Sequence, residues 1–334
     1  MNKNAKQDRR RFLLYALLVI AAGCFFLLWG QSNTAATLYE LGFLRYRAET
    51  QLESIPEWGL SEEEEALRSA AAEAAEDWLV QHSPREGSYV TESAAALLGE
   101  EVRLTLPYRH FDRGTGKTVI LLHGFGGSED DALLWAPWWW ERGYGVLIPT
   151  QRGYQHPGDT NVLPTAWGVY EQYDLRDLIL SAGLGGETVI VHAKGTGAAA
   201  ALLLAENGAL TDAGLDGIVA ESVYDNLGSL ERELLKELFH LGDRFVGVLL
   251  RDRVKRSLGF IVDSVDLSAG AAEARVPALF VCGAQEVLPG FARSQAVQDA
   301  WGGPSRLLLL SGSYRALGLT EEEAYRAAIA ELFP

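Results

Sequence analysis

Three charged side chains follow apolar runs that have the character of buried strands. Lys194 ends the run VIVHAK, Glu221 ends GIVAE, and Glu286 follows ALFVCG. An unpaired ammonium at such a place would be costly, so we expect Lys194 to pair with Glu221 or Glu286. Alternatively, strong desolvation would lower the pKa of Lys194 and make it a base or nucleophile, with the carboxylates available for acid–base chemistry or a cation.

Histidines and cysteines form no recognised pattern of metal ligands or disulfides. His156, in QRGYQHPGD, falls in a loop expected to border a pocket, either as a displaced general base or as a solvated side chain. His123 and His192 are expected to have packing roles. Cys24 and Cys282 lie far apart, and Cys24 falls within an apolar segment. No metal site, disulfide or cofactor is predicted.

Composition indicates a folded protein that does not bind nucleic acid. The chain has 334 residues, of which 48% are hydrophobic and 22% charged, enough for one large α/β domain with appendages. Its net charge is −16 and its pI is near 4.9. Phosphate binding depends on clustered Lys and Arg, so this balance argues against a polyanionic partner.

The chain after residue 101 alternates between apolar runs and helical patterns. The runs lack polar alternation, as expected for strands buried on both faces. This order predicts a doubly wound, mostly parallel sheet, in which ligands bind beyond the carboxyl ends of the strands. The predicted strands are 118–124, 144–150, 188–193, 217–222, 278–283 and 306–311, and the predicted helices are 129–142, 169–184, 196–207, 227–258, 291–301 and 320–333.

The N-terminus predicts a single membrane anchor. Residues 1–11 form a basic tail, and the uncharged residues 12–29 would span roughly 27 Å as a helix, close to the thickness of the bilayer core. The positive charges precede the apolar segment, which predicts a cytoplasmic tail and an extracytoplasmic main domain. Two alternatives remain open: a cleaved signal peptide, or a lipoprotein cleavage site at Cys24.

Residues 30–100 are predicted to form a stalk and an N-terminal helical segment before a domain at 101–334. Ser61 and Glu64 have the spacing of a capping box, which predicts a packing helix through about residue 80. The three consecutive tryptophans at 138–140 cannot all face the core of one helix. At least one should be partly exposed, either to lipid or a partner, or against the N-terminal helix.

The region 100–334 resembles the α/β-hydrolase family, most closely bacterial membrane-anchored or secreted hydrolases of the esterase-like and serine-aminopeptidase-like kind. The similar segments are HGFGG from His123, IPTQRGYQHPGD, TAWGVYEQYDLRDLI, the helix GTGAAAALLLA and ALFVCGAQEVLP. The resemblance implies an α/β-hydrolase fold with a helical cap, here at about 227–265, and hydrolysis of esters or peptides by a Ser–acid–His triad.

The triad positions have lost their chemistry in this sequence. The resemblance places Gly195 at the nucleophile, Glu286 at the acid and Tyr314 at the histidine, so only the acid keeps a suitable type. The last histidine is His240, before the acid. If the motif is shifted by one residue so that Thr196 is the nucleophile, Lys194 and Ala198 fall at the flanking positions, where the tight turn needs glycine or another small residue.

A binding role survives the loss of the triad. The backbone amides of Thr196 and Phe125 would correspond to the family's oxyanion hole and could bind a carboxylate, a carbonyl or an anion, unless both loops are only tight turns. We therefore predict a membrane-anchored pseudohydrolase that binds a small molecule or a protein. The alternatives are a hydrolase working through Lys194, Glu286, Thr196 or His156, and a purely structural partner of another membrane protein.

Overall fold

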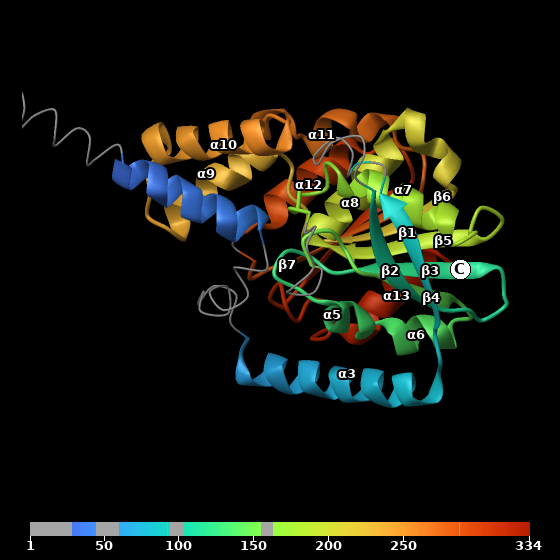
Figure 1. The fold of residues 1–334 in the computed structure, drawn as a ribbon. Helices are drawn as coiled ribbons and strands as arrows, with labels where there is room; N and C mark the ends of the chain where they lie inside the picture. The colour runs from blue at the N-terminus through green and yellow to red at the C-terminus, as the bar shows by residue number, and fades with distance from the viewer. Residues whose placement is uncertain (1–28, 45–59, 92, 94–102, 155–162, 287) are drawn as a thin grey trace, which may run out of the picture.

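A mixed eight-stranded sheet runs through the centre of the protein (Figure 1). The computed structural model describes residues 29–44, 60–91, 93, 103–154, 163–286 and 288–334. The strand order is β1-β2-β4-β3-β5-β6-β7-β8; β2 is antiparallel to β1 and β4, and the other neighbours are parallel. The strands are β1 (Arg85–Thr91), β2 (Leu104–Phe111), β3 (Lys117–Leu122), β4 (Gly145–Pro149), β5 (Thr188–Lys194), β6 (Leu215–Glu221), β7 (Ala278–Gly283) and β8 (Ser305–Leu310).

The six predicted strands are all present, and they form the parallel part of the sheet as expected. The strands β1 and β2 were not predicted. Both lie at the antiparallel edge, where buried and exposed residues alternate along the strand instead of forming a continuous apolar run. Because β1 pairs with β2 along its length, the folded unit begins N-terminal to the boundary expected at residue 101.

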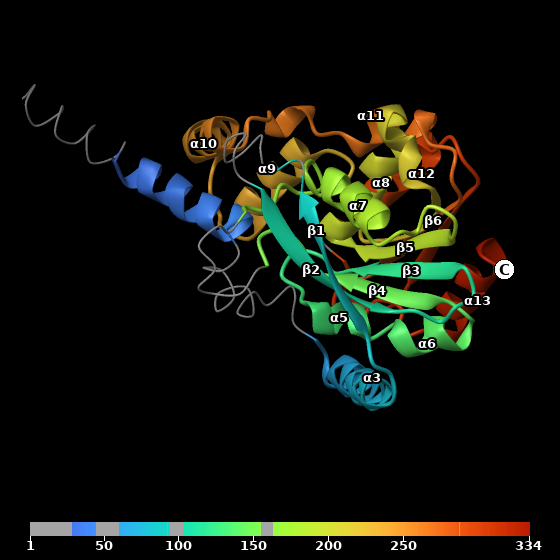
Figure 2. The ribbon, with the colours of Figure 1, turned by 45° about the vertical axis from the view of Figure 1, so that its right-hand side comes forward.

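Helices cover both faces of the sheet (Figure 2). Each face has its own apolar cluster. The main helices of one face are α7 (Glu171–Ser181), α8 (Gly195–Glu206), α11 (Leu267–Gly270) and α12 (Phe291–Ala300); those of the other are α3 (Glu62–Gln81), α5 (Glu129–Leu133), α6 (Ala136–Glu141) and α13 (Glu322–Leu332). The predicted helix 129–142 is divided into α5 and α6, and Pro137 lies in the first turn of α6, where its missing N–H is tolerated.

The predicted cap is helical but not one continuous helix. It consists of α9 (Leu227–Glu237), a π-helical turn η4 (Asp243–Gly247) and α10 (Val248–Leu258). Short 3-10 turns complete the chain at η3 (Gly208–Ala213), η5 (Val262–Ser264) and η6 (Ala271–Glu273). Leu230 and Leu234 of α9 line a cavity together with Gly195, so this helix covers the carboxyl end of β5.

A helix at residues 29–43 packs against the cap, where the sequence analysis placed part of a stalk. Its Ala35, Leu38, Tyr39 and Phe43 are buried in the same cluster as α9 and α10. This helix is therefore a part of the folded core. Apart from Trp29, the predicted span 12–29 lies outside the described residues, and within the described ranges no helix is long and apolar enough to cross a membrane.

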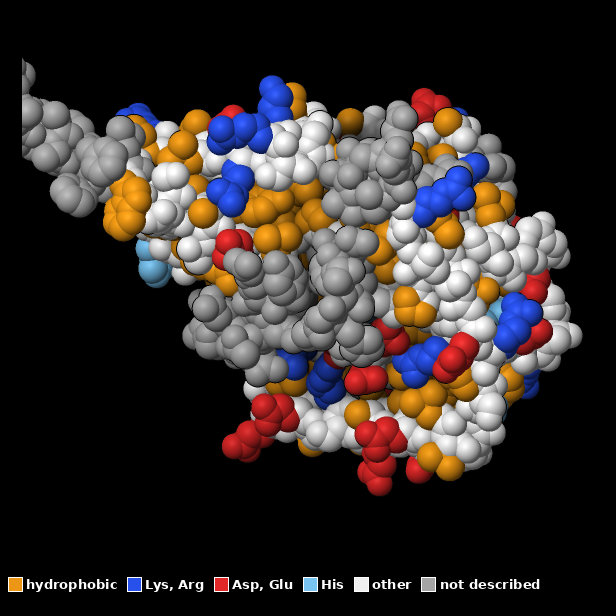
Figure 3. Space-filling model, viewed as in Figure 1, with side chains coloured by type: hydrophobic (Ala, Val, Ile, Leu, Met, Phe, Trp, Pro, Cys, Tyr) orange, Lys and Arg blue, Asp and Glu red, His pale blue; other side chains and the backbone are white. Residues whose placement is uncertain are grey.

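The helix α3 has the predicted capping box and closes one side of the protein. The Ser61 hydroxyl accepts from the Glu64 backbone N–H, and the Glu64 side chain accepts from the Ser61 backbone N–H. Trp140 is the partly exposed member of the three tryptophans and packs edge-on against Trp78 of α3, which confirms the packing alternative. Figure 3 shows acidic side chains projecting along α3, whereas Lys and Arg gather over α10.

Candidate functional site

The turn from β5 into α8 keeps the backbone of a nucleophile elbow without a nucleophile. Gly195, the first residue of α8, has a φ of 52°, in the left-handed region that disfavours side chains. A Cβ on Gly197 would lie 2.8 Å from the His123 carbonyl oxygen, so α8 approaches the end of β3 too closely for a larger residue. A small residue is therefore required at Gly197, as at the last position of the family's Gly-x-Ser-x-Gly turn, whereas Gly195 stands at the serine position of that turn.

The Tyr314 hydroxyl occupies the space where a nucleophile would project. A Cβ built on Gly195 would lie 2.6 Å from this oxygen, and one on Gly124 would lie closer still. The Tyr314 ring thus reaches from the loop after β8 to the point between the two glycines. The residues expected at the nucleophile and histidine positions are therefore sterically coupled: the Tyr314 hydroxyl fits only because Gly195 has no side chain.

Glu286, at the acid position, hydrogen-bonds to a serine that the sequence analysis did not consider. The Ser222 hydroxyl donates to the Glu286 Oε1 at 2.5 Å, and the Glu286 Oε2 is buried without a hydrogen-bond partner in the described part of the chain. Ser222 is 1% exposed and has a φ of 54°. Burial raises the pKa of Glu286 to about 7, although the bond from Ser222 opposes this shift.

Glu221, one residue before Ser222, belongs to a different network on the other side of the β6 end. Its Oε2 lies 3.0 Å from the Lys194 Nζ, and its Oε1 lies 2.9 Å from the His192 Nε2 and accepts from the Tyr325 hydroxyl. Burial alone would raise the pKa of Glu221, but Lys194 and these hydrogen bonds lower it to about 2. The expected buried pair of Lys194 is therefore with Glu221 and not with Glu286.

The tautomer of His192 follows from its neighbours. The Trp139 indole, which can only donate, donates to the His192 Nδ1 at 2.9 Å. The proton of a neutral ring is then on Nε2, which faces Glu221. His192 is 3% exposed, in keeping with the packing role expected from the sequence.

Two cavities meet at Tyr314, and they differ in size and lining. The smaller, about 50 Å³, is mostly apolar and contains the triad remnant: Phe125, Gly195, Thr196, Ser222 and Tyr314 line it with α9. Trp167 covers it, stacks on Phe125 with a centroid distance of 4.9 Å, and donates from its indole to the Gly42 carbonyl. The predicted oxyanion-hole residues Phe125 and Thr196 thus line the same space, which has room for a few water molecules.

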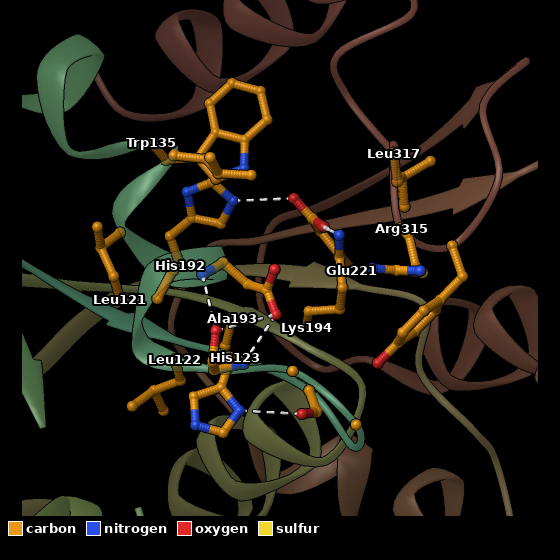
Figure 4. A pocket seen from close by; sticks show the side chains of 18 of the residues that line it. Leu121, Leu122, His123, Trp135, His192, Ala193, Lys194, Glu221, Arg315 and Leu317 are labelled. Carbon is orange, nitrogen blue, oxygen red and sulfur yellow. Dashed lines mark hydrogen bonds and ion pairs between the residues drawn. The ribbon is translucent and has the colours of Figure 1, made fainter. Parts of the chain in front are cut away.

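The larger cavity, about 500 Å³, lies on the side of Lys194 and Glu221. Its walls come from the end of β5, the glycine-rich loop after β3, α3, α5 and the loop after β8. In Figure 4, Trp135 and His192 lie on one side of this cavity, and Arg315 and Leu317 lie on the other. This volume is within the range of small-molecule sites.

Sequence reasoning located part of this site. Lys194, Glu221 and Tyr314 line the larger cavity, and His156 lies outside the described residues. Arg68 and Arg315, which also line it, were missed because they are almost 250 residues apart and belong to no motif. Ser222 could have been noticed, since it follows a buried strand as directly as Lys194 does.

Solved structures of hydrolases share this architecture. No protein-family model and no curated protein matches the sequence. An esterase from Pyrococcus furiosus is similar at a TM-score of 0.54, with 16% identity over 76% of this chain and 92% of its own. This chain has the α/β-hydrolase fold. Also similar is a lipase-esterase related protein from Clostridium acetobutylicum, at a TM-score of 0.51, with 13% identity over 68% of this chain and 99% of its own. An acylaminoacyl peptidase from Pyrococcus horikoshii is similar at a TM-score of 0.50, with 13% identity over 75% of this chain and 42% of its own.

Proposed function

We propose that this α/β-hydrolase-fold protein is a non-hydrolytic binding protein. One observation carries the proposal: the Tyr314 hydroxyl fills the position beside Gly195 from which a nucleophile would attack. A Ser–acid–His mechanism needs a hydroxyl or thiol at that point and an imidazole within reach of it. Neither is present at these positions, and the cavity around them, about 50 Å³, has no room for a scissile bond and its substituents.

A second candidate, hydrolysis through other residues, is favoured by the contact between Ser222 and Glu286. A hydroxyl 2.5 Å from a carboxyl group with a pKa of about 7 resembles a nucleophile with its general base. The positive φ of Ser222 fits the backbone strain found at functional sites. Against this candidate, Ser222 is 1% exposed, so a substrate would reach its hydroxyl only after neighbouring groups move.

Turnover of activated substrates by the full chain tests both candidates. We expect 4-nitrophenyl esters and aminoacyl 4-nitroanilides to be cleaved no faster than by the same protein after thermal unfolding. Turnover that disappears in Ser222→Ala or Glu286→Gln, but persists in the exposed control Ser264→Ala, would contradict the binding role and establish the second candidate. Turnover that disappears in Lys194→Ala would contradict it as well and identify a lysine-based site.

Membrane attachment through residues 12–29 is a further part of this proposal, with the tail in the cytoplasm and the fold outside it. The uncharged segment and the basic residues before it support this placement. The helix at 29–43, which packs on the cap, would then connect the anchor to the fold. Alkaline extraction of membranes and protease accessibility in intact cells test it: a chain released by alkali, or one protected from external protease, would contradict this arrangement.

A further inference from the structure

The larger cavity has a surplus of positive charge. Three cations line it, and two of them have carboxylate partners: Lys194 with Glu221, and Arg68 with Asp131. The third, Arg315, is partly buried, and its guanidinium forms no hydrogen bond or ion pair with the part of the chain that the structure describes. One positive charge therefore remains in the cavity, in a chain whose net charge is −16.

Arg68 and Arg315 come close to each other at this cavity. The Arg68 Nη1 donates to the Arg315 carbonyl oxygen at 3.2 Å. Burial, and then the positive charge of Arg315, lower the pKa of Arg68. Asp131 balances the charge of Arg68 but not that of Arg315, so an anion beside the two guanidinium groups would be favoured, and a carboxylate accepts the paired N–H groups of arginine well.

Part of the remaining wall of the cavity is formed by apolar side chains. Trp135 and Leu317 lie on opposite sides, and Leu121, Leu134 and Leu319 add to the lining. Trp135 is 7% exposed and is held edge-on against Tyr325, with ring centroids 4.9 Å apart. The cavity thus offers a firm apolar surface together with a single surplus cation, and a ligand that matches it would have one negative charge and an apolar body.

We propose that this cavity binds a small organic carboxylate with an aromatic or branched apolar body. The carboxylate is held by Arg315 and Arg68, and the apolar body lies against Trp135 and Leu317. A monoanion matches the single surplus charge, whereas a phosphate dianion would leave one negative charge in a partly buried space. The site is distinct from the triad remnant, and the inference deepens the binding role proposed above, on which it rests.

Binding of 4-fluorophenylacetate, followed by its fluorine NMR signal with the full chain in detergent micelles, tests the proposal. We expect saturable binding that is weakened about tenfold or more in Arg315→Gln, since a charge-assisted hydrogen bond is lost. The neutral analogue 4-fluorophenylacetamide should bind at least as weakly as the acid binds to that variant. Arg306→Gln, at an exposed arginine paired with Glu331, is the matched control and should bind like the wild type.

Three results would overturn the proposal. The first is the absence of saturable binding up to about 10 mM by protein whose urea transition shows that it is folded. The second is equal binding by the wild type and Arg315→Gln, and the third is tighter binding of 4-fluorophenyl phosphate than of the carboxylate. Because the probe has no bond to hydrolyse, these outcomes are independent of turnover: esterase activity would contradict the binding-only role without changing the result for this cavity.

Discussion

The two sides of Tyr314 differ: the turn between β5 and α8 is filled on one side, whereas a large space stays open on the other. On one side, Gly195 and Gly124 leave room that the tyrosine hydroxyl fills, and the remaining cavity is about 50 Å³. On the other side, Lys194 and Glu221 border a cavity of about 500 Å³. Adjacent residues of one turn thus face different spaces, since Gly195 lines the small cavity and Lys194 lines the large one.

The same contrast appears in two carboxylates at the ends of neighbouring strands. Glu221 has a pKa of about 2 because an ammonium and two hydrogen-bond donors surround it. Glu286 has a pKa of about 7, since its main environment is burial and its principal partner is a neutral hydroxyl. At neutral pH the ionisation of Glu221 thus stabilises the folded state, whereas the raised pKa of Glu286 destabilises it.

The largest effect is expected from breaking the charged network. Glu221→Gln leaves Lys194 without its counter-charge at a mostly buried position and should lower the free energy of unfolding by roughly 3 kcal/mol or more. Urea denaturation measures this change. Glu331→Gln, which breaks an exposed ion pair, is the control and should change it by less than about 1 kcal/mol. Equal effects of both substitutions would show that the network is not a main source of stability.

The pH dependence should differ in sign for the two carboxylates. The pKa of Glu221 is depressed when folded, so its contribution of roughly 3 kcal/mol is present above about pH 4.5 and is lost as the pH falls towards 2. The pKa of Glu286 is raised, so ionisation of the unfolded state costs stability as the pH rises from about 4.5 to 7. The stability of Glu286→Gln relative to wild type should therefore increase across pH 5–7; a flat difference would contradict the raised pKa.

A smaller effect should separate steric filling from backbone strain at the lapsed site. Gly195→Ala should destabilise by about 2 kcal/mol, from the left-handed φ and from contact with the Tyr314 hydroxyl. Adding Tyr314→Phe removes the contact, so the double variant should be more stable than the two single effects predict, by about 1 kcal/mol. Gly114→Ala, at a φ of 70° with open space, carries strain alone and should show no such coupling. Strict additivity at Gly195 would mean that Tyr314 does not fill the site.

The sequence predicted the parallel core of the fold because its strands are continuously apolar and end at turns of recognisable type. It did not predict β1 and β2, whose alternating burial at the sheet edge gives a weak signal. It predicted the pairing of Lys194 with Glu221 as one of two possibilities, and the register that places these residues opposite each other decides between them. The cavity beside them was not predictable, since Arg68 and Arg315 meet only through the packing of α3 against the loop after β8.

The absence of serine and histidine at the expected triad positions could be seen from residue types, but the contact between those positions could not. Gly195 and Tyr314 appeared as two independent losses in the sequence. In the structure the two positions are linked, because the hydroxyl of the second lies where the side chain of the first would be. Ser222 fits no motif; its place directly after a buried strand was the available signal, and its contact with Glu286 could not be foreseen.

Reaction with a fluorophosphonate tests the central claim, that the fold holds no activated nucleophile, most directly. An activated serine displaces fluoride and forms a stable phosphonate ester, which intact-mass spectrometry of the full chain detects. We predict an unchanged mass after prolonged incubation with excess reagent, in the wild type and in Ser222→Ala alike. A single stoichiometric adduct in the wild type that is absent from Ser222→Ala would contradict the claim and show that the chemistry has moved from the elbow to the end of β6.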